Sequence, residues 1–187
     1  MSQTIRERAD TIGTLRHISV FLMETLARWV PTTPELEAKV LFGRHVWEFA
    51  QHADLLGKRT AELRAALHYN LSPTAAYAAL LQDLANTEAT ASRIRLFYEG
   101  MLPELAARYG QYLGATDQLL DEPSVRIIER ILPDLDRMRR DAAAAVTEYP
   151  SFGSARVADA DHASARFALV TNWVAHRAPA ATSGALE

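Results

Sequence analysis

Long stretches of helix-favouring residues, separated by short breaks that contain proline, most constrain what this chain of 187 residues can fold into. Alanine, leucine, arginine and glutamate are abundant, and β-branched residues nowhere alternate with polar ones over a useful length. Breaks at Pro31, at residues 70–73 and at residues 121–123 separate four long helical stretches. We therefore expect an all-α protein built as an antiparallel four-helix bundle.

The start and stop signals give approximate bounds for these helices. Thr32 and Glu35 have the spacing of a capping box, which predicts the start of the second helix, and Ser72 is a natural N-cap for the third. The third helix should kink or restart near Pro103, and the fourth should bend at Pro133. The predicted spans are about residues 5–30, 34–68, 72–100 and 121–148.

Residues 1–150 should form one helical bundle domain, because a chain of this length supports one sizeable core. Beyond Pro150 the helical signal weakens, and residues 151–177 form an extension. Within it, residues 159–177 predict a short fifth helix with an apolar face made by Ala163, Phe167, Val170 and Val174. Residues 178–187 are expected to be a disordered tail.

The composition excludes several classes of function. The chain has no cysteine, which rules out disulfides, iron–sulfur clusters, thiolate zinc sites and cysteine nucleophiles. A formal net charge of -3 provides no basic field for a nucleic-acid partner. No apolar run approaches the roughly 18 residues that a membrane helix needs, and the first residues are polar. We expect a cytoplasmic protein that binds neither nucleic acid nor membrane.

Charged and imidazole side chains interrupt the expected apolar face of every helix. Burying an unpaired carboxylate is costly, so each such acid needs a cation, a metal ion or a proton. The second helix carries two histidines at core-type positions with an acid one turn from both, and each other helix carries one acid. These candidates are Glu24 on the first helix, His45, Glu48 and His52 on the second, Glu88 on the third and Asp134 on the fourth.

Two segments resemble helices of a known family. HVWEFAQHADLLGKRTAEL and DEPSVRIIERILPDLDRM are similar to the second and fourth helices of ferritin-like proteins, and the resemblance covers roughly residues 10–148. A complete ferritin-like site takes a glutamate from the first and third helices and Glu-x-x-His from the second and fourth. The resemblance therefore implies an iron or manganese site, with Glu24, Glu48, His52 and Glu88 as its ligands.

The sequence departs from the ferritin-like pattern at the second and fourth helices. Phe49 stands three residues before His52, where an acid is expected, and Glu48 lies about 100° away around the helix. The fourth helix offers Asp134 and Arg137 in place of Glu-x-x-His, and arginine cannot ligate a metal. Arg137 reaching into the acids would replace the metal by a buried ion network.

Two classes of function remain open on the sequence. The first is a metal-dependent oxidoreductase or oxygenase that acts on a small-molecule substrate with an altered iron or manganese site. The second is a non-catalytic bundle that binds a small ligand, with His45 and His52 as polar pocket residues, or that serves protein interaction. In either case a homodimer is expected from the resemblance. If Asp134 has only a structural role, we expect it to form a local ion pair with Arg137.

Overall fold

The structure is a computed structural model that describes residues 3–177, and for residues 157 and 158 it describes the backbone alone. Within these residues the regular structure is helical, apart from an isolated β-bridge between Pro73 and Val174, so the prediction of an all-α protein is confirmed. The elements are α1 (Ile5–Thr32), α2 (Leu36–Glu62), α3 (Ala75–Ala85), α4 (Thr90–Ile94), the π-helical η1 (Arg95–Met101), α5 (Leu102–Ala115), α6 (Glu122–Glu148), the 3-10 turn η2 (Pro150–Gly153) and α7 (Val157–Leu169).

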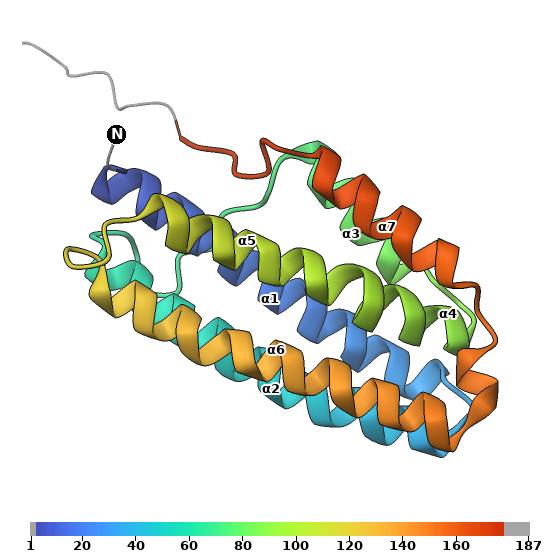
Figure 1. Cartoon of the computed structure of the whole chain (residues 1–187). Helices are drawn as coiled ribbons and strands as arrows, with labels where there is room; N and C mark the ends of the chain where they lie inside the picture. The colour runs from blue at the N-terminus through green and yellow to red at the C-terminus, as the bar shows by residue number, and fades with distance from the viewer. Residues whose placement is uncertain (1–2, 178–187) are drawn as a thin grey trace, which may run out of the picture.

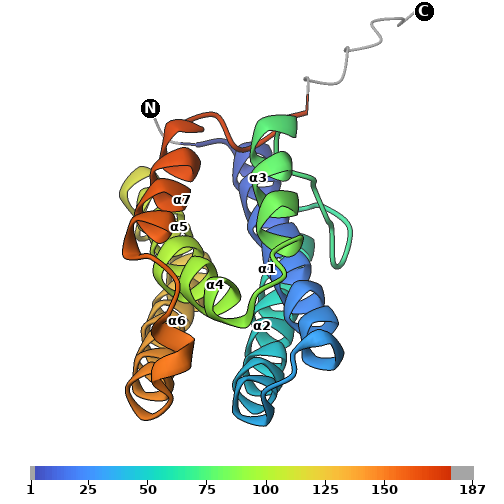
Figure 2. The ribbon, with the colours of Figure 1, turned by 90° about the vertical axis from the view of Figure 1, so that its right-hand side faces the viewer.

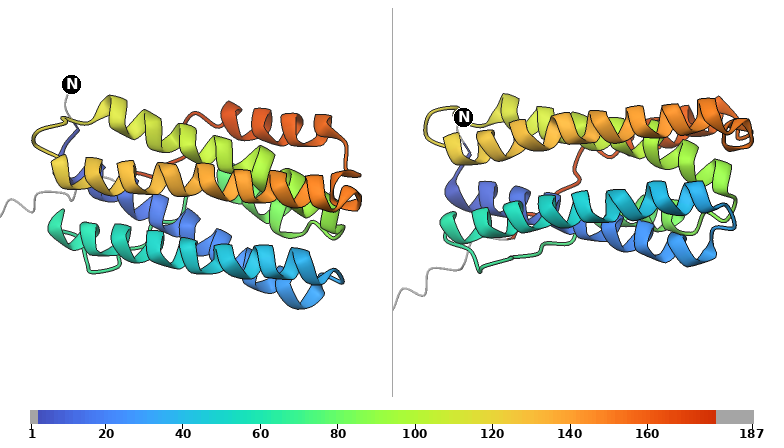
Figure 3. Two further views of the ribbon diagram at one scale, coloured as in Figure 1. Left: turned by 60° about the horizontal axis from the view of Figure 1, so that its bottom comes forward. Right: turned by 90° about the horizontal axis from the view of Figure 1, so that it is seen from below.

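Four long helical segments lie side by side along the length of the molecule (Figures 1 and 3). Helix α1 packs along α2, α2 lies against α6, and α6 against α5. In Figure 1, α1 and α6 run from left to right, whereas α2 and α5 run from right to left. A single long connection, which includes α3, joins α2 to the run of α4, η1 and α5. Figure 2 shows α3 and α7 on either side above α4.

Helix α1 has clear local causes. Thr4 and Glu7 form a capping box at its start, which satisfies backbone amides that have no partner within the helix. Its buried face follows a spacing of three and four residues through Leu15, Ile18, Leu22 and Leu26. Pro31 lies inside the last turn, and the helix ends at Thr32. The next residue, Thr33, is the C-cap, and its hydroxyl donates to the Trp29 carbonyl at 2.8 Å.

Two predicted caps are wrong. Thr32 belongs to α1, and its hydroxyl donates to carbonyls of that helix, so it cannot cap α2. The N-cap of α2 is Glu35, whose carboxylate instead accepts a hydrogen bond from Thr90 at 2.7 Å. Helix α3 is capped by Thr74 rather than Ser72. Helix α2 also ends at Glu62, six residues before the predicted position at 68.

The predicted third helix is broken in the middle. Residues 86–89 are not helical, and two carbonyls that a continuous helix would use accept hydrogen bonds from side chains. Trp29 donates to the Ala85 carbonyl at 3.1 Å, and Arg93 donates to the Thr87 carbonyl at 2.8 Å. Helix then continues without a break from Thr90 to Ala115, with the π-helical turn η1 just before Pro103. Helix α6 likewise continues through Pro133.

The C-terminal extension is helical only in its first part. Helix α7 ends at Leu169, short of the predicted 177, and residues 170–177 lie extended along the bundle. Phe167 and Val174 of the predicted apolar face are buried. Arg108 fixes this region by donating to the Phe167 carbonyl at 2.7 Å. The predicted tail, residues 178–187, lies outside the described residues.

Aromatic side chains fill the bundle between α1, α2 and η1. The rings of Trp29 and Phe42 lie 5.6 Å apart, and Phe97 lies 5.9 Å from both Trp29 and Phe49. All four rings are at most 2% exposed. Such edge-on aromatic contacts add stability beyond that of area burial. Among residues 3–177, no helix combines the length and apolar character needed to cross a membrane.

One buried ion pair holds the corner where α2, α5 and α6 meet. Arg59 donates to the fully buried carboxylate of Asp121 at 2.8 Å. Tyr112, Thr116 and Ser124 also donate to this carboxylate, at 2.6 to 2.8 Å. Burial alone would raise the pKa of Asp121, but hydrogen bonds from Tyr112, Ser124 and Arg59 outweigh it and lower the pKa.

We predict that Arg59→Met lowers the free energy of unfolding by roughly 3 to 5 kcal/mol, because it leaves a buried carboxylate without its cation. Urea unfolding at pH 7, followed by circular dichroism, measures the change. Arg126→Met is the matched control, since the ion pair of Arg126 with Glu122 is exposed and should contribute less than about 1 kcal/mol. Equal losses in the two variants would contradict this account of the corner.

Candidate functional site

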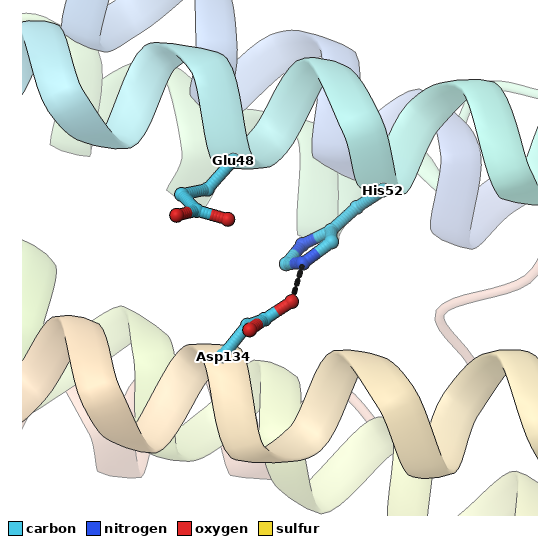
Figure 4. A group of neighbouring side chains, drawn as sticks. All are labelled: Glu48, His52 and Asp134. Carbon is cyan, nitrogen blue, oxygen red and sulfur yellow. Dashed lines mark hydrogen bonds and ion pairs between the residues drawn. The ribbon is translucent and has the colours of Figure 1, made fainter.

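Glu48 and His52 of α2 and Asp134 of α6 come together where these two helices meet (Figure 4). One ligand atom from each residue lies within 4.8 Å of the other two. His52 is buried, and the two acids are half-buried. In Figure 4 both side chains of α2 point toward α6. The sequence identified all three residues, since Glu48 and His52 are one turn apart on α2 and Asp134 interrupts the apolar face of α6.

Arg137 bridges the two acids of this cluster. Its guanidinium donates to Glu48 and to Asp134, each at 2.8 Å. The side chain is 45% exposed, so the bridge spans the mouth of the cluster rather than the bundle interior. The predicted ion pair between Asp134 and Arg137 is confirmed, and Arg137 also reaches across to α2. One cation thus balances two carboxylates on neighbouring helices.

His52 is a neutral partner in this arrangement. Its Nε2 lies 3.1 Å from the Asp134 carboxylate. Burial lowers the pKa of His52, against the opposing effect of Asp134 and Glu48. At neutral pH the Nε2–H therefore donates to Asp134. The buried Nδ1 has no hydrogen-bond partner among the residues that the structure describes.

A second chain of polar groups crosses the bundle about two helical turns away. The Tyr98 hydroxyl lies 2.7 Å from His45 Nδ1, and His45 Nε2 lies 3.4 Å from Asp141. Burial raises the pKa of Tyr98 well above its usual value, so the hydroxyl keeps its proton and donates to Nδ1. Burial also lowers the pKa of His45 to about 4. His45 is thus a neutral core histidine held by Tyr98 of η1 and Asp141 of α6.

The sequence missed Tyr98 and Asp141. Asp141 lies seven residues after Asp134, on the same face of α6, and that spacing could have indicated it. Tyr98 gave no such signal, because it stands among other apolar residues of the third predicted helix. Its partner could be found only once the packing of η1 against α2 was known.

Glu24 and Glu88 do not join the cluster, and the prediction that they face the core is wrong. Glu24 is exposed on α1. The buried face of that helix is centred on Leu22 and Leu26. Glu24 is two residues from each of them, about 200° around the helix axis, and therefore lies on the opposite side. Glu88 is also exposed, in the non-helical residues 86–89 between α3 and α4. Of the four predicted metal ligands, the structure brings together only Glu48 and His52.

The residues present do not fit a two-metal carboxylate centre. Such a centre takes ligands from all four helices of a bundle, whereas this cluster draws on α2 and α6 alone. Phe49 occupies the position where the second helix would supply an acid, and its ring is fully buried against Phe97. A single ion is the most that Glu48, His52 and Asp134 offer. Both carboxylates accept hydrogen bonds from Arg137, so an ion bound here would have to displace the guanidinium.

The chain was also compared with known proteins. No family model matches it, and no curated protein and no solved structure matches it either.

The environment of His45 predicts a specific pH dependence of stability. An unfolded histidine titrates near 6.5, and the folded His45 near 4, so only the unfolded chain takes up this proton between those values. The stabilisation that comes from the lowered pKa of His45 is complete above pH 6.5 and is lost as the pH falls toward 4. We expect the loss of this stabilisation to lower the free energy of unfolding by roughly 2 to 3 kcal/mol between pH 7 and pH 4.5.

Urea unfolding of the wild type and of His45→Gln at these two pH values measures this contribution. The glutamine amide oxygen can still accept from Tyr98, but it does not titrate. The variant should lose less stability than the wild type on acidification. Parallel losses in the two proteins would show that His45 is not the group responsible.

Proposed function

We propose that this chain is a ferritin-like bundle in which an arginine-centred ion network stands in place of a metal centre, and that it serves as a non-catalytic ligand-binding module. The order and directions of the helices support the ferritin-like part of the proposal. Helices α1 and α6 run one way and α2 and α5 the other, with one long connection between α2 and α5. Ferritin-like bundles have one such long crossover.

The bridge made by Arg137 is the observation that carries the proposal. A metal ion at this site would need oxygen atoms from Glu48 and Asp134, and both carboxylates already accept hydrogen bonds from the guanidinium. The third potential ligand, His52 Nε2, is hydrogen-bonded to Asp134. The charge that an ion would supply is thus provided by a side chain that cannot lose its proton in a protein. This arrangement favours a metal-free role.

The remaining acid–base groups support binding rather than catalysis. His45 and Tyr98 are each 1% exposed and are paired with each other, so a substrate would not contact them without a rearrangement of the core. A cavity of about 460 Å³ lies elsewhere, between α3 and α7. Cavities of this size commonly hold small molecules.

A second candidate function is a single-ion site with metal-dependent oxidoreductase activity. Two observations favour it: the ligand atoms of Glu48, His52 and Asp134 lie within 4.8 Å of one another, and His52 Nδ1 has no partner in the described structure. Glu48, His52 and Asp134 would hold iron or manganese after Arg137 turned outward. The ion would supply redox chemistry, and the three residues would position it.

The first proposal predicts that Arg137→His raises metal affinity. The substitution removes the competing cation and adds an imidazole one turn from Asp134. We expect Mn²⁺ and Zn²⁺ to bind at least about tenfold more tightly than to the wild type, as measured by equilibrium dialysis at pH 7.

Two matched variants separate the causes of that gain. Arg137→Met removes the cation without adding a ligand, and should gain less. Adding His52→Ala to Arg137→His should abolish the gain, because it removes the buried imidazole. Equal metal affinity in wild type and Arg137→His would contradict the proposal that Arg137 occupies the place of an ion.

A further inference from the structure

The cavity between α3 and α7 lies apart from the ion network of Arg137, Glu48 and Asp134, and that network gives it no role. It lies on the flank of the bundle, where α3 and α7 stand on either side above α4 (Figure 2). Its volume of about 460 Å³ falls within the range of sites that bind small molecules. None of the residues of the Glu48 cluster lines it. It is therefore a separate feature of the molecule.

The floor of the cavity is apolar and firmly held. Leu84 of α3 and Phe167 of α7 are 5% and 3% exposed. Leu80 and Leu96 are half-buried beside them. The Phe167 ring packs on the buried Tyr77 with centroids 5.1 Å apart, which fixes its position. A ligand with an apolar body would cover these side chains and release the water on them.

The rim of the cavity is polar, with a negative balance. It is lined by Asp83 of α3 and by Asp159, His162 and Arg166 of α7. Arg166 donates to Asp83 at 2.7 Å, so this guanidinium is already matched. The partner of Asp159 is Arg156, at the longer distance of 3.5 Å; both ion pairs are exposed, and the longer one is the easier to replace. Among the residues that line the cavity, two carboxylates thus stand beside one guanidinium, and Arg156 is not one of the lining residues.

We infer that this cavity binds a small amphipathic amine, and the inference rests on the proposal that the protein is a ligand-binding module. The apolar body lies on Leu80, Leu84 and Phe167. The ammonium group sits at the rim near Asp159, where it replaces the exposed partner Arg156. Charge complementarity selects an amine over a carboxylate of the same size, because a carboxylate would face Asp159 and find Arg166 paired with Asp83.

Two probes of similar length and opposite charge test this inference: 4-phenylbutylamine and 4-phenylbutyrate. Isothermal titration calorimetry at pH 7 and low salt should show the amine binding the full chain at least about tenfold more tightly than the carboxylate. Asp159→Asn should weaken binding of the amine by about two- to fivefold, since the carboxylate is partly solvated. It should not weaken binding of the carboxylate probe. Equal affinity for the two probes, or no binding of the amine, would overturn the inference.

A second pair of variants locates the binding. Leu80→Trp fills the cavity and should abolish binding of the amine, whereas Leu119→Trp, the same change at an 83% exposed position outside the cavity, should not affect it. Undiminished binding to Leu80→Trp would place the amine elsewhere and overturn the inference. If Leu80→Trp does not fold, as judged by circular dichroism, Asp159→Asn alone decides.

The same preparations keep the two proposals distinct. Wild-type protein that is free of metal but does not bind the amine overturns the assignment of this cavity and leaves the Arg137 network intact. Wild-type protein with stoichiometric metal overturns the network, whatever the probes show.

Discussion

A carboxylate inside this bundle needs a positive partner, and arginine supplies it at each buried acid in the part of the chain that the structure describes. Asp121 is paired with Arg59, Glu104 with Arg108, and Asp10 with Arg177. Two of these pairs also tie separate segments of the chain together, since Arg59 links α2 to the start of α6 and Arg177 anchors the end of the described chain to α1. The half-buried pair of Glu48 and Asp134 follows the same rule through Arg137.

This constraint explains why the cluster on α2 and α6 differs from a metal centre. Two acids and a histidine that converge in a bundle can be neutralised by an ion or by a guanidinium, and the two solutions exclude each other at one place. Arginine here takes both carboxylates, while aromatic rings fill the interior beside Phe49. A separate cavity with an apolar floor lies on the flank of the bundle, between α3 and α7.

Helix periodicity was enough to predict the fold class and to identify Glu48, His52 and Asp134 as candidates, because residues one turn apart share a face whatever their surroundings. It did not predict that Asp134 of α6 joins the two residues of α2. It misplaced Glu24, since a mostly apolar stretch does not by itself say which side is buried. Glu88 lies in the break at residues 86–89, where side chains of Trp29 and Arg93 donate to backbone carbonyls. Local propensity carries no information about such contacts, nor about the pairing of Tyr98 with His45.

The most direct test of the central claim is the metal content of wild-type protein. The protein is produced with iron and manganese supplied, purified without chelators and examined by elemental analysis beside His52→Ala. If Arg137 occupies the place of an ion, both proteins contain far less than one metal ion per chain and unfold cooperatively. Close to one iron or manganese ion per wild-type chain, lost in His52→Ala, would contradict the account and establish a metal site on α2 and α6.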